Sequence, residues 1–122
     1  MAREHGHEFV FITDYPVGER PFYHQRREGD PNVTASYDLI WKGVEITTGA
    51  QREHRIDHLE RQAIEAGFGT ETLADYLGFF RSGCPPHGGF GLGLARLMML
   101  LLDQPGVRET TLLPRTPKRL RL

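Results

Sequence analysis

A glycine-rich apolar segment that runs directly into a helix constrains the fold of this chain more than any other feature. The segment is Gly88-Gly89-Phe90-Gly91-Leu92-Gly93, and residues 94–102 after it are apolar apart from Arg96. Glycine has no Cβ, so such a strand leaves bare backbone on which a flat ligand or a neighbouring strand can lie. At the start of the helix, the Arg96 guanidinium offers a permanent charge and several donors to phosphate. The pattern indicates a nucleotide site, although close backbone packing of the glycines and an ion pair of Arg96 elsewhere are open alternatives.

The glycine segment differs from the common phosphate-binding loops. A dinucleotide loop makes a tight turn inside a βαβ unit, and the sequence predicts neither the turn nor the unit here. The lysine and hydroxyl of a P-loop are also missing. The glycines are therefore expected to belong to a strand.

Size and composition favour one ordinary globular domain over residues 1–122. Hydrophobic residues make up 39% of the chain and charged residues 25%, and the net charge of −1 provides no overall field for nucleic acid or a membrane. The longest apolar run, 97–102, is too short to cross a bilayer, and no signal peptide is visible. Cys84 is the only cysteine, which excludes an internal disulfide. We therefore expect a cytoplasmic protein with no membrane partner.

Short apolar runs bounded by turn residues predict the strands. They cover 8–13, 36–41 and 44–48, and the last two are joined at Lys42-Gly43 as a hairpin. The segment 20–25 is expected to be extended, and a last strand is expected near 110–113. The glycine segment, 88–93, is the remaining predicted strand.

Helical spacing of apolar residues predicts three helices. Two follow each other over about 53–66 and 70–82, the second capped by Thr70 and ended by Gly83, and the third covers 95–103. Because the strands are grouped and do not alternate regularly with helices, we expect an α+β fold. It would consist of an antiparallel sheet flanked by helices.

Two carboxylates and a hydroxyl on the predicted hairpin form a candidate metal site. Asp38, Glu45 and Thr48 lie on neighbouring extended segments and offer only oxygen ligands. Such ligands suit Mg²⁺, which binds one or two carboxylates and completes its shell with water and nucleotide phosphate. The alternative is that both acids are exposed strand residues.

An arginine directly after the hairpin is a candidate for binding a carboxylate. Arg52 lies near the predicted start of a helix, and its guanidinium can hold a carboxylate through two hydrogen bonds. The alternative is a surface ion pair with Glu53 or Asp57. A lone histidine, His87, lacks the partners that a metal site would need.

Seven blocks of the chain, in matching order and spacing, resemble one family. They are Arg20-Pro21-Phe22-Tyr23, Ser36-Tyr37-Asp38, Gly43-Val44-Glu45-Ile46, Gly49-Ala50-Gln51-Arg52, Pro85-Pro86-His87-Gly88-Gly89, Gly91-Leu92-Gly93-Leu94-Ala95-Arg96 and Pro114-Arg115-Thr116-Pro117-Lys118-Arg119-Leu120. The blocks resemble the C-terminal part of the catalytic domain of class II aminoacyl-tRNA synthetases, in the aspartyl/asparaginyl subgroup, and most of all the archaeal-type aspartyl-tRNA synthetases. The resemblance implies a partial class II catalytic domain with ATP lying on an antiparallel sheet.

The resemblance also implies roles for phosphate and metal ligands. Arg96 matches the arginine of the family's third signature, which contacts the terminal phosphates of a bent ATP, and is the expected catalytic residue. Asp38, Glu45 and Thr48 match the positions that hold ATP-bound Mg²⁺, and Thr48 is commonly serine there.

Further residues are assigned to the substrates in the same way. Arg52 matches the arginine that binds the side-chain carboxylate of L-aspartate, and Gln51 beside it is expected to serve the same substrate. Gly91, Gly93 and His87 are expected to bind ATP together with Glu45 and Arg96. The implied reaction joins aspartate to AMP and then passes it to a tRNA, by positioning and charge stabilisation without a protein nucleophile.

Two positions depart from the family pattern, and part of that pattern has no match. Ala95 stands where the family has an acid before the arginine, and Thr116 stands where aspartate is common. The first two signatures and the anticodon-binding barrel have no counterpart in the sequence. We therefore expect a synthetase module that is active with a missing half supplied by a second chain, or weakly active alone, and a homodimer is the other open partner. The alternatives are a truncated non-catalytic paralogue, which binds ligands or regulates, and an inactive remnant.

Overall fold

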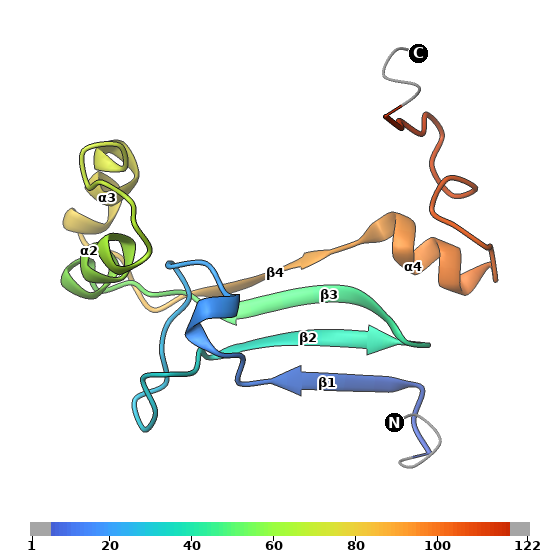
Figure 1. The fold of residues 1–122 in the computed structure, drawn as a ribbon, viewed down its shortest axis with the longest axis horizontal. Helices are drawn as coiled ribbons and strands as arrows, with labels where there is room; N and C mark the ends of the chain where they lie inside the picture. Colours follow the sequence, from blue (N-terminus) through green and yellow to red (C-terminus); the bar gives the residue numbers. More distant parts are fainter. Residues whose placement is uncertain (1–5, 118–122) are drawn as a thin grey trace.

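The fold is built on one antiparallel sheet. The computed structural model describes residues 6–117 and contains four strands in the order β1-β2-β3-β4 (Figure 1). The strands are β1 (Phe9–Thr13), β2 (Ser36–Trp41), β3 (Val44–Gln51) and β4 (Gly88–Leu92). Every neighbouring pair is antiparallel. Together with the helices, the sheet confirms the predicted α+β class.

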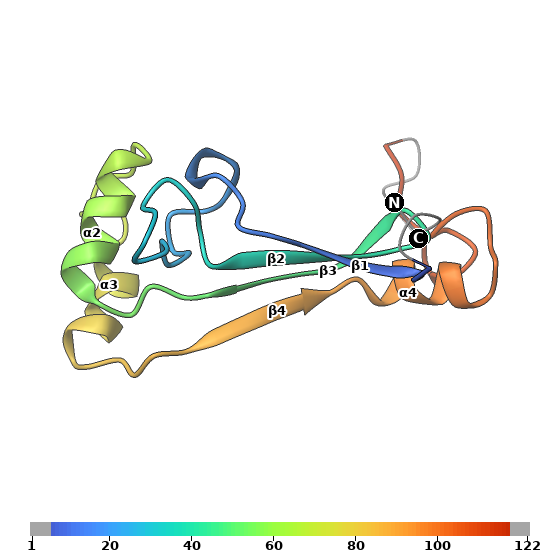
Figure 2. The ribbon, with the colours of Figure 1, turned by 90° about the horizontal axis from the view of Figure 1, so that it is seen from below.

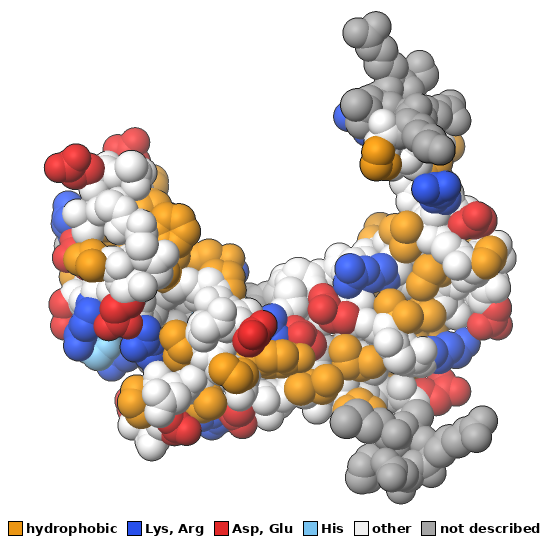
Figure 3. Space-filling model, viewed as in Figure 1, with side chains coloured by type: hydrophobic (Ala, Val, Ile, Leu, Met, Phe, Trp, Pro, Cys, Tyr) orange, Lys and Arg blue, Asp and Glu red, His pale blue; other side chains and the backbone are white. Residues whose placement is uncertain are grey.

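The helices lie beyond the two ends of the strands. Helices α2 (Ile56–Glu65) and α3 (Ala74–Arg81) lie together at one end, and α4 (Leu94–Leu101) leaves β4 at the other (Figures 1 and 2). A short 3-10 helix, η1 (Val17–Glu19), follows β1. In the view of Figures 1 and 3 the chain has a U shape, whose open side lies beyond the free edge of β4. No helix among residues 6–117 is long and apolar enough to span a membrane.

An irregularity in the β2–β3 hairpin decides which side chains share a face. Asp38 pairs with Thr48 and Leu39 with Thr47, but Ile40 pairs with Glu45, so β3 contains one extra residue at this point. In a regular strand, residues 45 and 48 would point to opposite faces. The extra residue shifts the alternation, as a β-bulge does, and brings Glu45 to the face of Asp38 and Thr48.

The opposite face carries the packing core. Trp41, Ile46 and Leu100 are buried together, and partly buried apolar residues pack against them: Leu39, Val44, Leu97 and Met99. Residues 39, 41, 44 and 46 lie on this face because the bulge offsets the two strands. We call it the packing face, and the face of Asp38, Glu45 and Thr48 the site face.

The predicted helical faces are confirmed in part at the other end of the sheet, since Ile64, which the spacing places on the face of Leu59 and Ala63, is 61% exposed. Leu59 and Ala63 of α2 and Leu77 of α3 have no exposed surface. Helix α2 is followed by Gly67, whose φ of 83° is a conformation that glycine adopts readily. Leu59 and Ala63 follow the helical repeat that the sequence indicates.

Three local predictions are wrong. Residues 110–113 form no strand, because a turn over 107–110 is followed by a bend at 112–113 and the Thr110 and Thr111 hydroxyls donate to the Val107 carbonyl. Thr70 does not cap α3, since turns occupy residues 70–73 and the helix starts at Ala74. The segment 20–25 is not continuously extended, because the His24 N–H donates to the Pro21 carbonyl and closes a turn. Of the C-terminal family block, residues 118–120 lie outside the described residues.

Candidate functional site

The site face gathers several of the residues that the sequence singles out. Asp38 and Thr48 are register partners, and Gly91 of β4 pairs with Thr48 on its other side. The bulge adds Glu45 to the same face. Acidic and basic side chains gather over the middle of the sheet, on the face shown in Figure 3.

An arginine for which the sequence predicts no role, Arg20, lies at the centre of this group. Nη2 of Arg20 lies 2.7 Å from Oδ2 of Asp38, and Nη1 donates to the Thr48 hydroxyl at 3.1 Å. The guanidinium also lies over the Tyr15 ring, 3.7 Å from its centroid. Arg20 opens one of the family blocks, but neither spacing nor composition links it to an aspartate on a different strand.

The Asp38 carboxylate is buried and remains charged. Burial raises the pKa of Asp38, but the hydrogen bonds that it receives, with Arg20 first among them, lower it by more. The pKa of Asp38 therefore lies below its ordinary value. Oδ1 of Asp38 is buried and has no hydrogen-bond partner among the described residues.

Arg96 reaches back from α4 to the bulged strand. Its Nη1 donates to the Glu45 backbone carbonyl at 3.0 Å and lies 3.3 Å from Oε1 of the Glu45 carboxylate. Both side chains are about half exposed. Gly93 lies directly beneath, since a Cβ there would stand 3.4 Å from Cδ of Arg96. Arg96 is thus paired on the site face itself and is accessible to a ligand.

Arg52 lines a shallow pocket on the site face. Its guanidinium lies 4.2 Å from the centroid of the Tyr23 ring, a cation–π contact that holds it at the pocket wall. The alternative, an ion pair between Arg52 and Glu53, does not form, because the Glu53 carboxylate pairs with Arg55 at 2.9 Å. The Arg52 backbone N–H donates to the carbonyl of His87.

Gln51 and His87 do not line this pocket. Nε2 of Gln51 donates to the His87 carbonyl at 2.9 Å, so this amide supports the loop before β4. The His87 ring turns to that loop as well, with Nδ1 3.1 Å from the Pro85 carbonyl and 3.6 Å from Sγ of Cys84. In this conformation, both residues hold the loop.

The pocket itself is floored by bare backbone. It has a volume of about 280 Å³, and Arg20, Tyr23, Thr48 and Arg52 line it together with Gly89 and Gly91 of β4. A Cβ at Gly89 or Gly91 would meet no atom within 4 Å. The two glycines therefore leave open space over the sheet. Close packing of backbone does not account for them, whereas a flat ligand could occupy this space.

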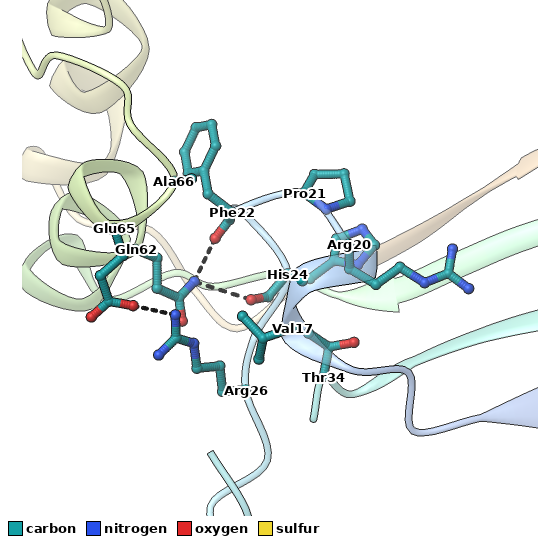
Figure 4. Close-up of a pocket in the computed structure, with 11 residues that line it drawn as sticks. Val17, Arg20, Pro21, Phe22, His24, Arg26, Thr34, Gln62, Glu65 and Ala66 are labelled. Carbon is teal, nitrogen blue, oxygen red and sulfur yellow. Dashed lines mark hydrogen bonds and ion pairs between the residues drawn. The ribbon is translucent and has the colours of Figure 1, made fainter. Parts of the chain in front are cut away.

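A second, larger cavity lies behind the segment that carries Arg20. Its volume is about 420 Å³, and Figure 4 shows Val17, Phe22 and Gln62 at its wall. The Gln62 amide donates to the backbone carbonyls of Phe22 and His24, and an ion pair between Arg26 and Glu65 lies beside it. These contacts tie the segment of residues 20–26 to α2, which fixes the place from which Arg20 reaches the sheet.

His24, buried between the two cavities, is neutral at physiological pH. Burial, together with the neighbouring charges of Arg52 and Arg20, lowers the pKa of His24 to about 4. Its Nδ1 has no hydrogen-bond partner among the described residues. A neutral imidazole adds no third positive charge between two arginines.

The oxygen groups of the site face fit magnesium in kind, but two of them are already engaged. Asp38 and Thr48 both bind Arg20 in buried contacts, whereas the Glu45 carboxylate contacts Arg96 at 3.3 Å and stays half exposed. Among residues 6–117 there is no cluster of three or more histidine, cysteine, aspartate or glutamate side chains placed to hold a metal. Glu45 is therefore the group most accessible to a metal ion that arrives with a nucleotide.

Comparison with known proteins identifies the class. A family model of class II tRNA synthetases (D, K and N) matches residues 1–117, and the chain belongs to that family. Within it the chain is aspartyl-tRNA synthetase-like. It is 45% identical over 113 residues to the aspartate–tRNA(Asp/Asn) ligase of Aeropyrum pernix, covering 93% of this chain and 26% of that protein. It is 47% identical over 120 residues to the aspartate–tRNA(Asp) ligase of Pyrococcus abyssi, covering 98% and 27%.

Solved structures agree with the sequence relatives. The aspartyl-tRNA synthetase from Entamoeba histolytica superposes with a TM-score of 0.93 at 43% identity, covering 98% of this chain and 25% of that chain. The four-stranded sheet with its helices is thus a fragment of the class II synthetase fold. The chain spans about a quarter of the length of these relatives.

Proposed function

We propose that the chain binds Mg²⁺-ATP and L-aspartate on its site face, as part of an aspartyl-tRNA synthetase-like enzyme that forms aspartyl-adenylate and charges a tRNA. One observation carries the proposal: Asp38, Glu45, Arg52 and Arg96 lie along one face of the sheet, above glycines with open space. Relatives that are named aspartate–tRNA ligases support the choice of amino acid and of tRNA.

The proposed reaction is phosphoryl and acyl chemistry run by position and charge. An α-carboxylate oxygen of aspartate attacks the α-phosphorus of ATP, the bond to the β-phosphate oxygen breaks, and pyrophosphate leaves. Arg96, already half exposed beside Glu45, is the residue that we assign to the terminal phosphates. Arg52 is assigned to the side-chain carboxylate of aspartate, because its guanidinium lines the pocket and no acidic side chain among the described residues lines it beside Arg52.

Bare backbone and magnesium complete the proposed site. Gly91 and Gly93 would let the nucleotide lie against the sheet without a Cβ between them. We assign the ion that accompanies ATP to Glu45, with Asp38 and Thr48 on the same face. Magnesium neutralises phosphate charge as it develops during transfer.

Aspartate-dependent exchange of pyrophosphate into ATP tests the proposal on the full chain. We expect exchange that needs both aspartate and Mg²⁺. Arg52→Met should raise the KM for aspartate roughly 100-fold, and Arg96→Met should slow exchange by roughly 10²–10³-fold, the usual loss for one preorganised contact. Arg81→Met is the matched control, because Arg81 pairs with Glu60 at the far helical end. Absence of both exchange and any thermal shift with Mg²⁺-ATP would contradict the proposal.

A second candidate function is ligand binding without turnover, as in a truncated regulatory paralogue. The observation in its favour is Ala95, which puts no charge beside Arg96 where the family has an acid. It predicts a thermal shift with Mg²⁺-ATP and aspartate but no exchange. A third result would be exchange that requires a second chain to supply the rest of the catalytic domain. That result would favour a two-chain enzyme over the regulatory paralogue and over a homodimer. For either function we propose a cytoplasmic location, in line with the free thiol of Cys84.

A further inference from the structure

Arg52 is held on the site face in a different way from Arg20 and Arg96. Those two arginines each contact a carboxylate, at 2.7 Å and 3.3 Å. Arg52 instead lies over the Tyr23 ring, 4.2 Å from its centroid. A carboxylate cancels the charge of the arginine that it holds, whereas a neutral ring attracts the cation and leaves its charge in place. The contact that holds Arg52 therefore keeps a full positive charge at the pocket wall.

The pocket beside Arg52 contains nothing that would offset this charge. Among the described residues, no aspartate or glutamate lines it. Arg20 also lines the pocket, but its charge is balanced by Asp38. The His24 imidazole there is neutral, because burial lowers its pKa. A ligand in this pocket thus meets one uncompensated guanidinium, which binds an ionised carboxylate more strongly than a neutral amide.

The backbone and the neighbouring rings fix Tyr23 against Arg52. Residue 24 pairs with residue 52 in an isolated antiparallel bridge, and the Glu53 N–H donates to the Tyr23 carbonyl at 3.0 Å. The rings of Phe22 and His24 meet the Tyr23 ring edge-on, with centroids 5.5 and 5.3 Å away. Such edge contacts limit the movement of the ring. The contact with Arg52 is made by the ring and needs no hydroxyl.

We propose that Tyr23 is a positioning residue that determines specificity: its ring holds Arg52 at the pocket wall with its charge uncompensated, so that the pocket selects the side-chain carboxylate of aspartate over the neutral amide of asparagine. The inference rests on the proposed binding of aspartate. The two amino acids differ in charge far more than in shape, so a pocket that separates them must do so by charge. A carboxylate at position 23 would also hold Arg52, but it would remove the preference.

Titration of the full chain with L-aspartate and L-asparagine tests the proposal without turnover. Binding is followed by the NMR signal of the Arg52 Nε–H group, which is assigned with Arg52→Lys and which the Tyr23 ring shifts upfield. We expect Tyr23→Leu to remove this shift and to weaken aspartate binding roughly tenfold, with asparagine binding unchanged within twofold. Tyr23→Glu should abolish the preference, and Tyr23→Gln, its uncharged counterpart, should retain part of it. Tyr37→Leu removes a ring from the packing face and is the matched control, with neither affinity changed.

Tyr23→Phe keeps the proposal falsifiable if Tyr23→Leu does not fold. It retains the ring and should bind aspartate within twofold of wild type, so a tenfold loss would overturn the proposal. A folded Tyr23→Leu would also overturn it by keeping the upfield signal, by binding aspartate as tightly as wild type, or by losing both amino acids equally.

Succinate, a dicarboxylate without an amino group, separates this inference from the proposed function. A wild type that binds succinate but not aspartate contradicts the proposed function alone. In that case, the role of Tyr23 stands if Tyr23→Leu weakens succinate binding roughly tenfold and is overturned if it does not. A wild type that binds neither compound overturns both.

Discussion

The two faces of the same four strands differ in almost every property. On the packing face, apolar side chains meet each other, as in the stacked rings of Phe9 and Trp41, whose centroids are 5.1 Å apart. On the site face, charged groups meet each other, as in Arg20 with Asp38 and Arg96 with Glu45. The glycines follow the same division. Gly49 is crowded by the Tyr37 ring on the packing face, whereas Gly91 opens to free space on the site face.

The difference shows that one extra residue organises the chemistry. Simple alternation would place Glu45 with the apolar core and separate it from Thr48 by the thickness of the sheet. The bulge at Ile46 instead buries Val44 and Ile46 on one side and turns Glu45 to the other, where Arg96 meets it. Packing and site formation thus depend on the same local irregularity.

Removing the largest core side chain should break the packing face most severely. Trp41 is 8% exposed, and its indole N–H donates to Glu8. We expect Trp41→Ala to lower the free energy of unfolding by about 3–5 kcal/mol. Ile12→Ala on the site face, at a residue already 38% exposed, should cost only about 1 kcal/mol. Urea denaturation followed by circular dichroism measures both, and equal costs would contradict the division of the faces.

The same glycine-to-alanine change on each face should have opposite consequences. At Gly49 the new Cβ would stand 2.6 Å from the Tyr37 ring, so we expect a loss of stability of about 1–3 kcal/mol with little change in ATP affinity. At Gly91 the new methyl group would meet no atom, so stability should hold while ATP affinity falls about tenfold. Calorimetric titration with Mg²⁺-ATP and thermal melting separate the two. If Gly91→Ala leaves ATP affinity intact, the nucleotide does not lie on β4.

Local pattern was enough to predict most of the elements and not enough to predict how they share a site. The sequence predicts the hairpin, the glycine strand and part of the buried face of α2, because repeats of two and 3.6 residues can be recognised within short stretches. The strand expected at 110–113 failed because its apolar residues find no sheet edge and the threonine hydroxyls close turns instead.

The site shows the same limit. Asp38, Glu45, Arg52 and Arg96 were named from family blocks, and the structure gathers them on one face, while their roles in binding stay predictions. No sequence pattern reveals the bulge that aligns Glu45, since an extra residue looks like any other in a strand. Arg20 was missed for a related reason. It lies 18 positions before Asp38 in the sequence, and tertiary contacts of its loop bring the two together: backbone bonds to the end of β3 and the Gln62 amide of α2.

The pH dependence of stability should reveal the neutral histidine of the site face. The pKa of His24 is about 4 in the folded chain, below the ordinary value of 6.5. Between these two pH values His24 is protonated in the unfolded chain but neutral in the folded chain. The free energy of unfolding therefore decreases as the pH falls from 6.5 towards 4. The loss should be on the order of 1–2 kcal/mol, because solvent and side-chain movement soften the full effect of burial.

His24→Gln isolates this contribution, because glutamine is uncharged throughout the range. The carboxylates of Asp38 and Glu53, whose pKa values lie below their ordinary ones, lose their pairing only at lower pH. Urea denaturation of wild type and variant at pH 6.5, 5.5 and 5.0 should therefore show a steeper fall for wild type. Parallel curves would mean that His24 is protonated in the folded chain. A positive imidazole would then lie between Arg20 and Arg52, and the site face would carry one more positive charge than the structure indicates.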